Sequence, residues 1–103
     1  MTKPEFTVRL LRAAEEDLND IIEYIAADNP SAAAAVLDRI ENDLRLLSQQ
    51  PQLGRIPEEE DLVRMGYRFL IVRDYLIFYT LEEKTILVHR IVHGAREFFV
   101  MDS

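Results

Sequence analysis

Residues 65–97 read MGYRFLIVRDYLIFYTLEEKTILVHRIVHGARE, and this stretch decides the fold. It contains three runs rich in Val, Ile, Phe and Tyr, separated only by Arg73-Asp74 and by Glu82-Glu83-Lys84. Beta-branched and aromatic side chains suit strands, and polar interruptions this short leave room only for tight hairpins. The stretch therefore predicts an antiparallel meander of three strands.

The last run has two unlike faces, because side chains alternate along a strand. Strict alternation places His89 beside Ile91 on one face and Arg90 beside Val92 on the other. Both faces carry apolar residues, so we expect one of them to pack against helices. The tyrosines of the meander are expected to pack on the sheet with exposed hydroxyls: Tyr67, Tyr75 and Tyr79.

The N-terminal half predicts one strand and two helices. Phe6, Val8 and Leu10 alternate with polar residues, which is typical of a short strand. Apolar residues then recur at helical spacing in two series, at Ala14, Leu18, Ile21, Ile22 and Ile25, and at Ala33, Val36, Leu37, Ile40, Leu44 and Leu47. Asn29 suits a helix cap and Pro30 a first helical position, so the two helices are expected to meet there as an antiparallel hairpin.

The resulting order is β-α-α-β-β-β. It predicts an α+β domain in which the two-helix hairpin packs on a small, mostly antiparallel sheet. Residues 50–62 show no periodicity, and their sequence fits a functional loop and a simple spacer equally well. At 103 residues, we expect residues 1–103 to form one domain.

Composition excludes several classes of site. The chain has no cysteine and only two histidines, so we expect neither a cofactor nor a metal site. No run approaches the roughly 20 apolar residues that span a bilayer, and the first residues lack the apolar core of a secretion signal. These features predict a cytoplasmic protein without a membrane partner.

Charge is unevenly distributed along the chain, whose net charge is −7. Residues 1–63 hold six Lys and Arg against fourteen Asp and Glu, whereas residues 64–96 hold six against three. An acidic chain is repelled by nucleic-acid phosphates at long range, because non-specific affinity comes from Lys and Arg. Only the meander is suited to approach an anion.

Five segments follow one another along the chain: AEEDLNDIIEYI in the first helix, NPSAA at the helix joint, PQLGR after the second helix, RDYLIFY in the hairpin, and IVHGAREF near the end. In this order they resemble the RelE/ParE family of toxins from bacterial type II toxin–antitoxin systems. The resemblance covers nearly the full chain, and the hairpin and closing segment look closer to ParE.

The resemblance implies one of two activities. ParE-like members act on DNA gyrase, and RelE-like members enter the ribosome and cleave mRNA. We favour a ParE-like, non-enzymatic gyrase inhibitor that inhibits growth, has the plasmid-stabilising role of such modules, and is neutralised by a ParD-like antitoxin in a hetero-oligomer. The alternatives are a metal-independent, ribosome-dependent endoribonuclease and a degenerate member that only binds antitoxin.

Cleavage of RNA without a metal needs a group that takes the 2′-hydroxyl proton and cations that stabilise the phosphorane. The catalytic candidates are Arg64, Arg68, His93 and Arg96. Each also has a structural interpretation. Arginines on strands, for example, pair with nearby carboxylates, and such surface pairs contribute little to stability. The family's ribonucleases hold ribosomal RNA through a lysine-rich segment. This chain lacks such a segment, because Lys84 is its only lysine after Lys3.

The resemblance also implies an antitoxin segment that folds onto the toxin, as a helix in an apolar groove or as a strand on a sheet edge. We expect the groove to lie between the helical hairpin and the sheet. The candidate residues are Leu11, Ile22, Leu37, Ile56 and Leu62, each of which also suits an ordinary core position.

Overall fold

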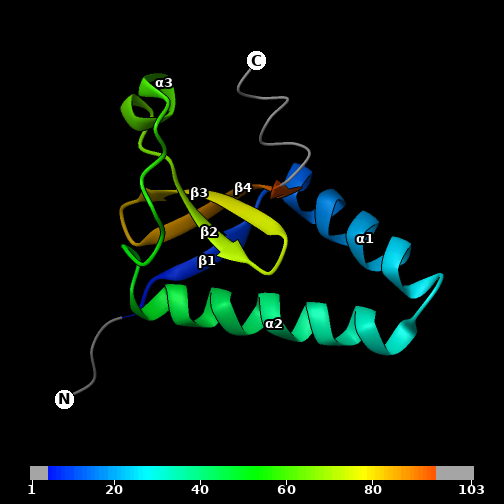
Figure 1. The fold of residues 1–103 in the computed structure, drawn as a ribbon. Helices are drawn as coiled ribbons and strands as arrows, with labels where there is room; N and C mark the ends of the chain where they lie inside the picture. Colours follow the sequence, from blue (N-terminus) through cyan, green and yellow to red (C-terminus); the bar gives the residue numbers. More distant parts are fainter. Residues whose placement is uncertain (1–4, 95–103) are drawn as a thin grey trace.

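The computed structural model describes residues 5–94 and contains the predicted meander. Strands β2 (Arg68–Val72), β3 (Tyr75–Glu82) and β4 (Thr85–His93) form two antiparallel hairpins. Strand β1 (Thr7–Leu10) pairs in parallel with β4, which gives the sheet order β1-β4-β3-β2 (Figure 1). The predicted α+β class and mostly antiparallel sheet are confirmed.

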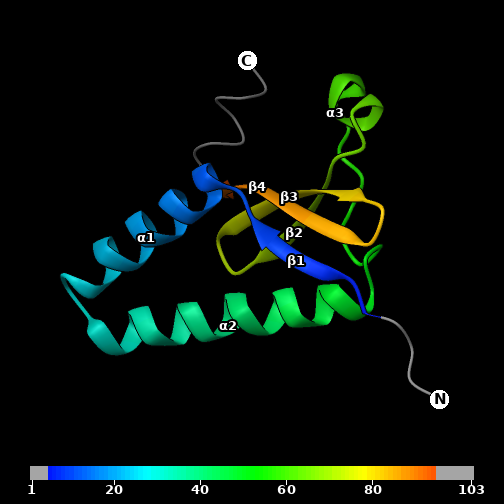
Figure 2. The same ribbon diagram turned by 180° about the vertical axis from the view of Figure 1, so that it is seen from behind.

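Two helices form the predicted hairpin and cover one face of the sheet (Figures 1 and 2). Helix α1 spans Arg12–Ala26 and helix α2 spans Pro30–Gln49. The Asn29 side chain accepts a hydrogen bond from the Ala32 N–H at 3.1 Å, and Pro30 is the first helical residue. The predicted cap is therefore confirmed.

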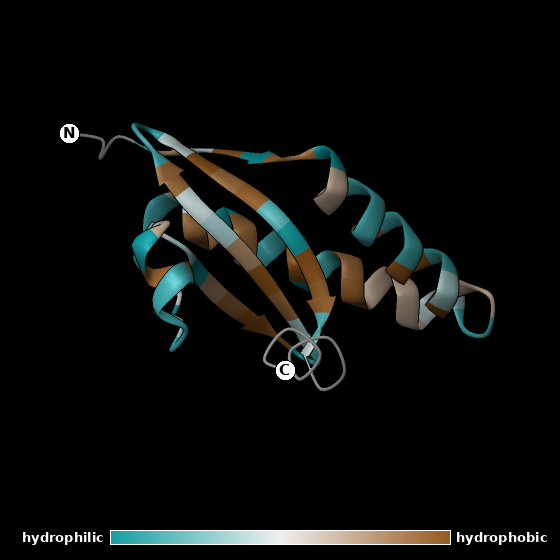
Figure 3. Cartoon of the chain, turned by 90° about the horizontal axis from the view of Figure 1, so that it is seen from above, coloured by the Kyte–Doolittle hydropathy of each residue, from teal (hydrophilic) through white to brown (hydrophobic). Residues whose placement is uncertain are grey.

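The main core lies between the helices and this face of the sheet. Apolar side chains from α2 and from β2, β3 and β4 meet there without measurable exposure: Ile40, Leu47, Val72, Ile77, Tyr79, Ile86 and Val88. Ala14 of α1 is also fully buried, while Leu18, Ile21, Ile22 and Ile25 pack around the core half-buried. Seen from above, apolar residues run along the strands of the sheet (Figure 3).

A β-bulge interrupts the expected alternation of β4. Phe78 pairs with Arg90 but Tyr79 pairs with Val88, so His89 is an extra residue on β4. After one extra residue, the side chains that follow on the strand point to the opposite face of the sheet from the one that strict alternation predicts. Ile91 therefore joins Val88 in the helix-side core, and the prediction that His89 lies beside Ile91 is wrong.

The segment between α2 and β2 is more ordered than its composition suggests. It contains a short helix, α3 (Glu60–Arg64), and Arg55 forms an isolated antiparallel bridge with Phe69. Leu62 of α3 packs against a second apolar cluster, formed by Leu76, Phe78 and Val92. Leu76 and Phe78 alternate along β3 with Ile77 and Tyr79 of the helix-side core, so the second cluster lies on the outer face of the sheet.

Candidate functional site

The outer face of the sheet carries a polar network centred on His89. The Tyr67 hydroxyl lies 3.2 Å from His89 Nδ1, and the Thr80 hydroxyl lies 2.9 Å from His89 Nε2. The rings of Tyr67 and His89 also meet edge to face, with centroids 4.8 Å apart. The His89 imidazole on β4 thereby connects Thr80 of β3 with Tyr67, the residue directly before β2.

Burial lowers the pKa of His89, and the nearby Glu82 carboxylate opposes this shift only in part. The neutral imidazole, which the lower pKa favours, has one donor and one acceptor nitrogen, and the two hydroxyls can satisfy both. Neither ring nitrogen is left to take a proton from a bound molecule. The geometry thus agrees with a structural role for His89.

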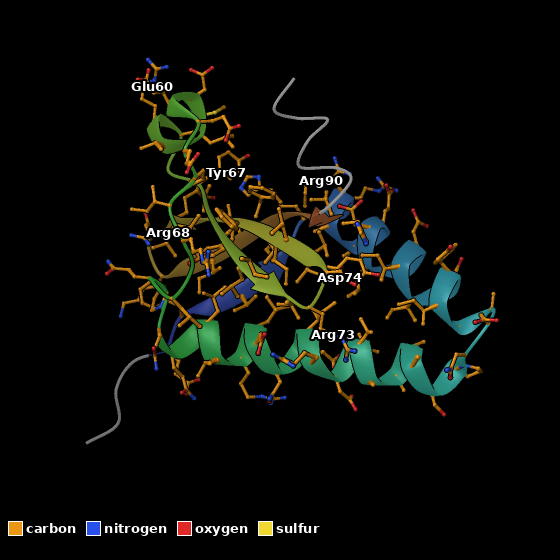
Figure 4. The ribbon with its side chains drawn as sticks, viewed as in Figure 1. Glu60, Tyr67, Arg68, Arg73, Asp74 and Arg90 are labelled. Atoms are coloured by element: carbon orange, nitrogen blue, oxygen red, sulfur yellow. The ribbon has the colours of Figure 1, made fainter. Side chains whose placement is uncertain are left out.

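The arginines proposed for catalysis have separate partners. Arg64 is hydrogen-bonded to the Asp61 carboxylate within α3, at an exposed position. Arg68 Nη1 donates to the Gly54 carbonyl at 3.0 Å. Arg90, which is not one of the catalytic candidates, lies beside Asp17 of α1 (Figure 4). Arg96 lies outside the described residues.

His93 is distant from Arg68. It pairs with Tyr75 in the sheet, and the two rings meet edge to face with centroids 5.6 Å apart. Arg68 pairs with Tyr79, which is four residues further along β3, or about 13 Å. His93 Nδ1 is buried and has no hydrogen-bond partner among residues 5–94. The register thus separates Arg68 from His93, and the role of Arg64, Arg68 and His93 in catalysis stays a prediction.

Tyr79 differs from the prediction that its hydroxyl is exposed. Its side chain is completely buried, and its hydroxyl donates to the Pro51 carbonyl at 2.8 Å and accepts from the Gly54 N–H at 2.9 Å. Burial raises the pKa of Tyr79, while the Gly54 N–H and the charge of Arg68 lower it. The hydroxyl faces inward because the loop after α2 supplies the two polar partners that a buried tyrosine requires.

Metal-binding groups of three or more His, Asp or Glu side chains are absent from residues 5–94. In the same range no helix combines the length and apolar character needed to cross a bilayer.

Comparison with known proteins places this fold in a family. A family model described as "ParE toxin of type II toxin-antitoxin system, parDE" matches residues 8–98. The chain belongs to the ParE toxin family. A search of curated proteins found no match.

Two solved structures share the fold of this ParE-family chain. One is from the chromosomal ParDE toxin–antitoxin system of P. aeruginosa, with a TM-score of 0.71 and 21% identity over 86% of this chain and 96% of that one. The other is from the RelBE2 toxin–antitoxin complex of Mycobacterium tuberculosis, with a TM-score of 0.60 and 24% identity over 87% of this chain and 99% of that one. At these identities the likeness concerns the fold.

The five residues predicted to bind an antitoxin do not line one groove in this ParE-family chain. Ile22 packs on the helix-side core, whereas Leu62 packs on the outer-face cluster. Ile56 is 59% exposed on the loop, and Leu11 and Leu37 are half-buried. The set divides because α3, which the sequence does not signal by periodicity, carries Leu62 to the outer face. Their part in binding stays a proposal.

The PQLGR segment of the family resemblance has a structural explanation. A Cβ added to Gly54 would meet the Tyr79 hydroxyl at 2.5 Å and the Phe69 carbonyl at 2.9 Å, so no larger residue fits. The loop can therefore approach β2 and β3 closely only with glycine at this position. An isolated glycine after a proline in an aperiodic segment is the signal that could have located this contact.

Proposed function

We propose that this ParE-family chain inhibits bacterial growth by binding DNA gyrase in the cytoplasm, and that a ParD-like antitoxin neutralises it. It belongs to the ParE toxin family by its match over residues 8–98. One observation supports a mechanism of binding and not of catalysis: both ring nitrogens of His89 are hydrogen-bonded to hydroxyl groups of the protein itself. A general base needs a nitrogen free to reach the proton it removes.

The distribution of cations supports the same mechanism. A ribonuclease needs several cations directed at one phosphate. Here Arg64 pairs with Asp61, and Arg68 is bonded to the Gly54 carbonyl. The net charge of −7 further disfavours attraction to ribosomal RNA. A protein surface, by contrast, can be recognised through exposed apolar side chains such as Ile56, Met65 and Ile71.

The test is to induce the protein alone in a bacterium and follow growth, gyrase–DNA cleavage complexes and transcript ends. We expect growth to stop, cleavage complexes to accumulate and transcripts to remain intact. Transcript cuts at regular codon positions would contradict the gyrase proposal and identify a ribonuclease. Undiminished growth would contradict any toxic activity, and undiminished growth with antitoxin binding intact would identify a member that only binds antitoxin.

Two histidine variants sharpen this test. His93→Gln replaces the ring whose Nδ1 is buried without a partner among residues 5–94, and His89→Gln replaces the ring with two partners. We expect both variants to remain toxic when soluble protein is matched. Loss of toxicity and of transcript cuts in His93→Gln alone would assign ribonuclease chemistry to that residue.

The antitoxin proposal needs a separate measurement. Co-expression with a candidate antitoxin, a ParD-like protein encoded next to the gene, is expected to restore growth and to yield a hetero-oligomer by size-exclusion chromatography with light scattering. Failure to restore growth together with failure to co-purify would reject that protein as the antitoxin.

A further inference from the structure

Residues 56–68 leave the edge of the sheet and return to the point where they left it. Arg55 and Phe69 exchange backbone hydrogen bonds of 2.8 and 2.9 Å, so the two ends of the segment lie side by side. A loop of two residues is enough to join antiparallel partners. The need to connect α2 with β2 therefore does not explain these residues, which we call the arm.

The arm is held in place by contacts at its base and along its length. Arg68 Nη1 donates to the Gly54 carbonyl at 3.0 Å, and Leu62 packs on the outer-face cluster. The Tyr67 N–H donates to the Leu62 carbonyl at 3.0 Å and closes α3 onto the start of β2. Figures 1 and 2 show α3 standing clear of α1 and α2. A segment fixed in this way loses little further freedom on binding, which favours affinity.

The arm exposes an unusual share of the apolar side chains. Residues 5–94 contain eight large apolar side chains that are exposed, and three of them belong to the arm: Ile56, Val63 and Met65, at 59%, 46% and 65%. The other five are spread singly over α1, α2, the loop at Leu53, β2 and β3. Single exposed apolar residues are ordinary, but several on one projecting segment mark a surface that another molecule covers.

The carboxylates of the arm restrict which molecule that can be. Glu58 and Glu60 are exposed, and neither is in an ion pair within residues 5–94. Glu60 lies at the outer end of the arm (Figure 4). A partner that covers the apolar side chains brings its surface against these carboxylates, which costs free energy unless cations compensate for the lost water. The arm therefore fits an apolar surface bordered by lysine or arginine.

We propose that the arm is the part of this chain that contacts DNA gyrase. Ile56, Val63 and Met65 enter an apolar hollow of the enzyme, and Glu58 and Glu60 pair with basic side chains at its border. This inference rests on the gyrase target proposed above. An enzyme that binds DNA presents lysine and arginine, so gyrase offers the required charge. Ribosomal RNA and a second copy of this chain are poorer partners, because phosphates and a second acidic arm repel the same carboxylates.

Two serine variants test the apolar contact. Ile56→Ser and Met65→Ser each remove an exposed apolar side chain from the arm, whereas the control Tyr24→Ser removes one that is 84% exposed on α1. We expect each arm variant to weaken binding to purified gyrase by about tenfold, the effect of one apolar side chain that is no longer buried. Tyr24→Ser should leave the affinity nearly unchanged. Surface plasmon resonance with immobilised gyrase measures all three.

Reversal of charge tests the acidic contact. Glu58→Lys changes the arm, and Glu41→Lys makes the same change at an exposed position of α2. We expect Glu58→Lys to weaken gyrase binding by about fivefold more than Glu41→Lys at low salt. The difference should decline at about 0.5 M salt, because salt screens exposed charges.

The substituted side chains lie outside the core, so we expect every variant to keep the unfolding midpoint of the unchanged chain. Should one arm variant not fold, the other two decide the question. The proposal is overturned if folded arm variants bind gyrase as tightly as the unchanged chain, or if Tyr24→Ser weakens binding equally.

The proposal is also overturned if the arm variants weaken antitoxin binding and leave gyrase binding unchanged, because the arm would then belong to the antitoxin interface. Absence of gyrase binding by the unchanged chain would instead reject the proposed target, and the contact with it.

Discussion

Asp17 and Arg90 join α1 to β4 at the point where β1 ends. Arg90 Nε and Nη2 donate to the two oxygens of the Asp17 carboxylate at 2.7 and 3.0 Å. The Ile91 N–H donates to the same carboxylate at 2.9 Å. Pairing of β1 with β4 stops at Leu10 and Val88, so the carboxylate takes the place of the next strand residue.

Replacing Asp17 is therefore expected to destabilise the protein. Asp17→Ala would leave the Ile91 N–H and the Arg90 guanidinium without this acceptor, and hydrogen bonds to charged groups contribute about 1.5–3 kcal/mol. We expect a loss of about 2 kcal/mol in the free energy of unfolding, measured by urea denaturation. Arg90→Ala should cost less, since Asp17 then keeps its bond to Ile91. A larger loss in Arg90→Ala than in Asp17→Ala would contradict this explanation.

Tyr79→Phe is expected to loosen the loop after α2. The substitution removes one hydroxyl that serves both Pro51 and Gly54, and it leaves the buried Gly54 N–H unsatisfied. Such a loss costs about 1–3 kcal/mol. Faster amide exchange at Gly54, together with a lower unfolding midpoint, would show the effect.

Tyr75→Phe is the matched control for this prediction. Tyr75 is on the same strand and is only half-buried, and its hydroxyl makes no hydrogen bond with residues 5–94. Its loss of a hydroxyl should change stability by less than about 0.5 kcal/mol. Equal losses in the two variants would mean that the loop contact of Tyr79 contributes little.

The elements with local signals were predictable from the sequence. Asn29 and Pro30 are residue types that favour a helix start, and they begin α2. The runs of β2, β3 and β4 are separated by turns too short for any connection other than a hairpin. Each of these features depends on neighbours within a few residues, so periodicity and capping rules suffice.

The features that were missed depend on distant partners. The bulge at His89 results from pairing with β3, and no residue type at that position announces an inserted residue. The Asp17 carboxylate looks like an ordinary acid in the first turns of a helix, yet its partners are more than seventy residues away. Tyr79 becomes buried only because the loop at Gly54 folds over it. The candidate site was consequently less predictable than the fold.

His89 should make stability depend on pH in the acidic range. Burial lowers its pKa in the folded state, while the unfolded value is near 6.5. Below that pH the unfolded chain binds more protons than the folded one, so stability decreases as pH falls. We expect the unfolding free energy of the unchanged chain to fall relative to that of His89→Gln as the pH is lowered from 8 to 5. A pH-independent difference would contradict the assigned shift.

The hairpin between β3 and β4 contains a residue in a costly conformation. Glu83 has φ of 55°, in the left-handed region that is unfavourable for residues with a Cβ by roughly 1–2 kcal/mol. Glu83→Gly removes this cost but makes the unfolded chain more flexible, which offsets part of the gain. We expect a net increase of about 0.5–1 kcal/mol in the free energy of unfolding. Lys84→Gly is the control, because Lys84 has no positive φ and its ammonium lies 5.4 Å from the Phe6 ring centroid. Stabilisation by Lys84→Gly as large as by Glu83→Gly would show that turn flexibility, and not the φ of Glu83, limits the stability of this hairpin.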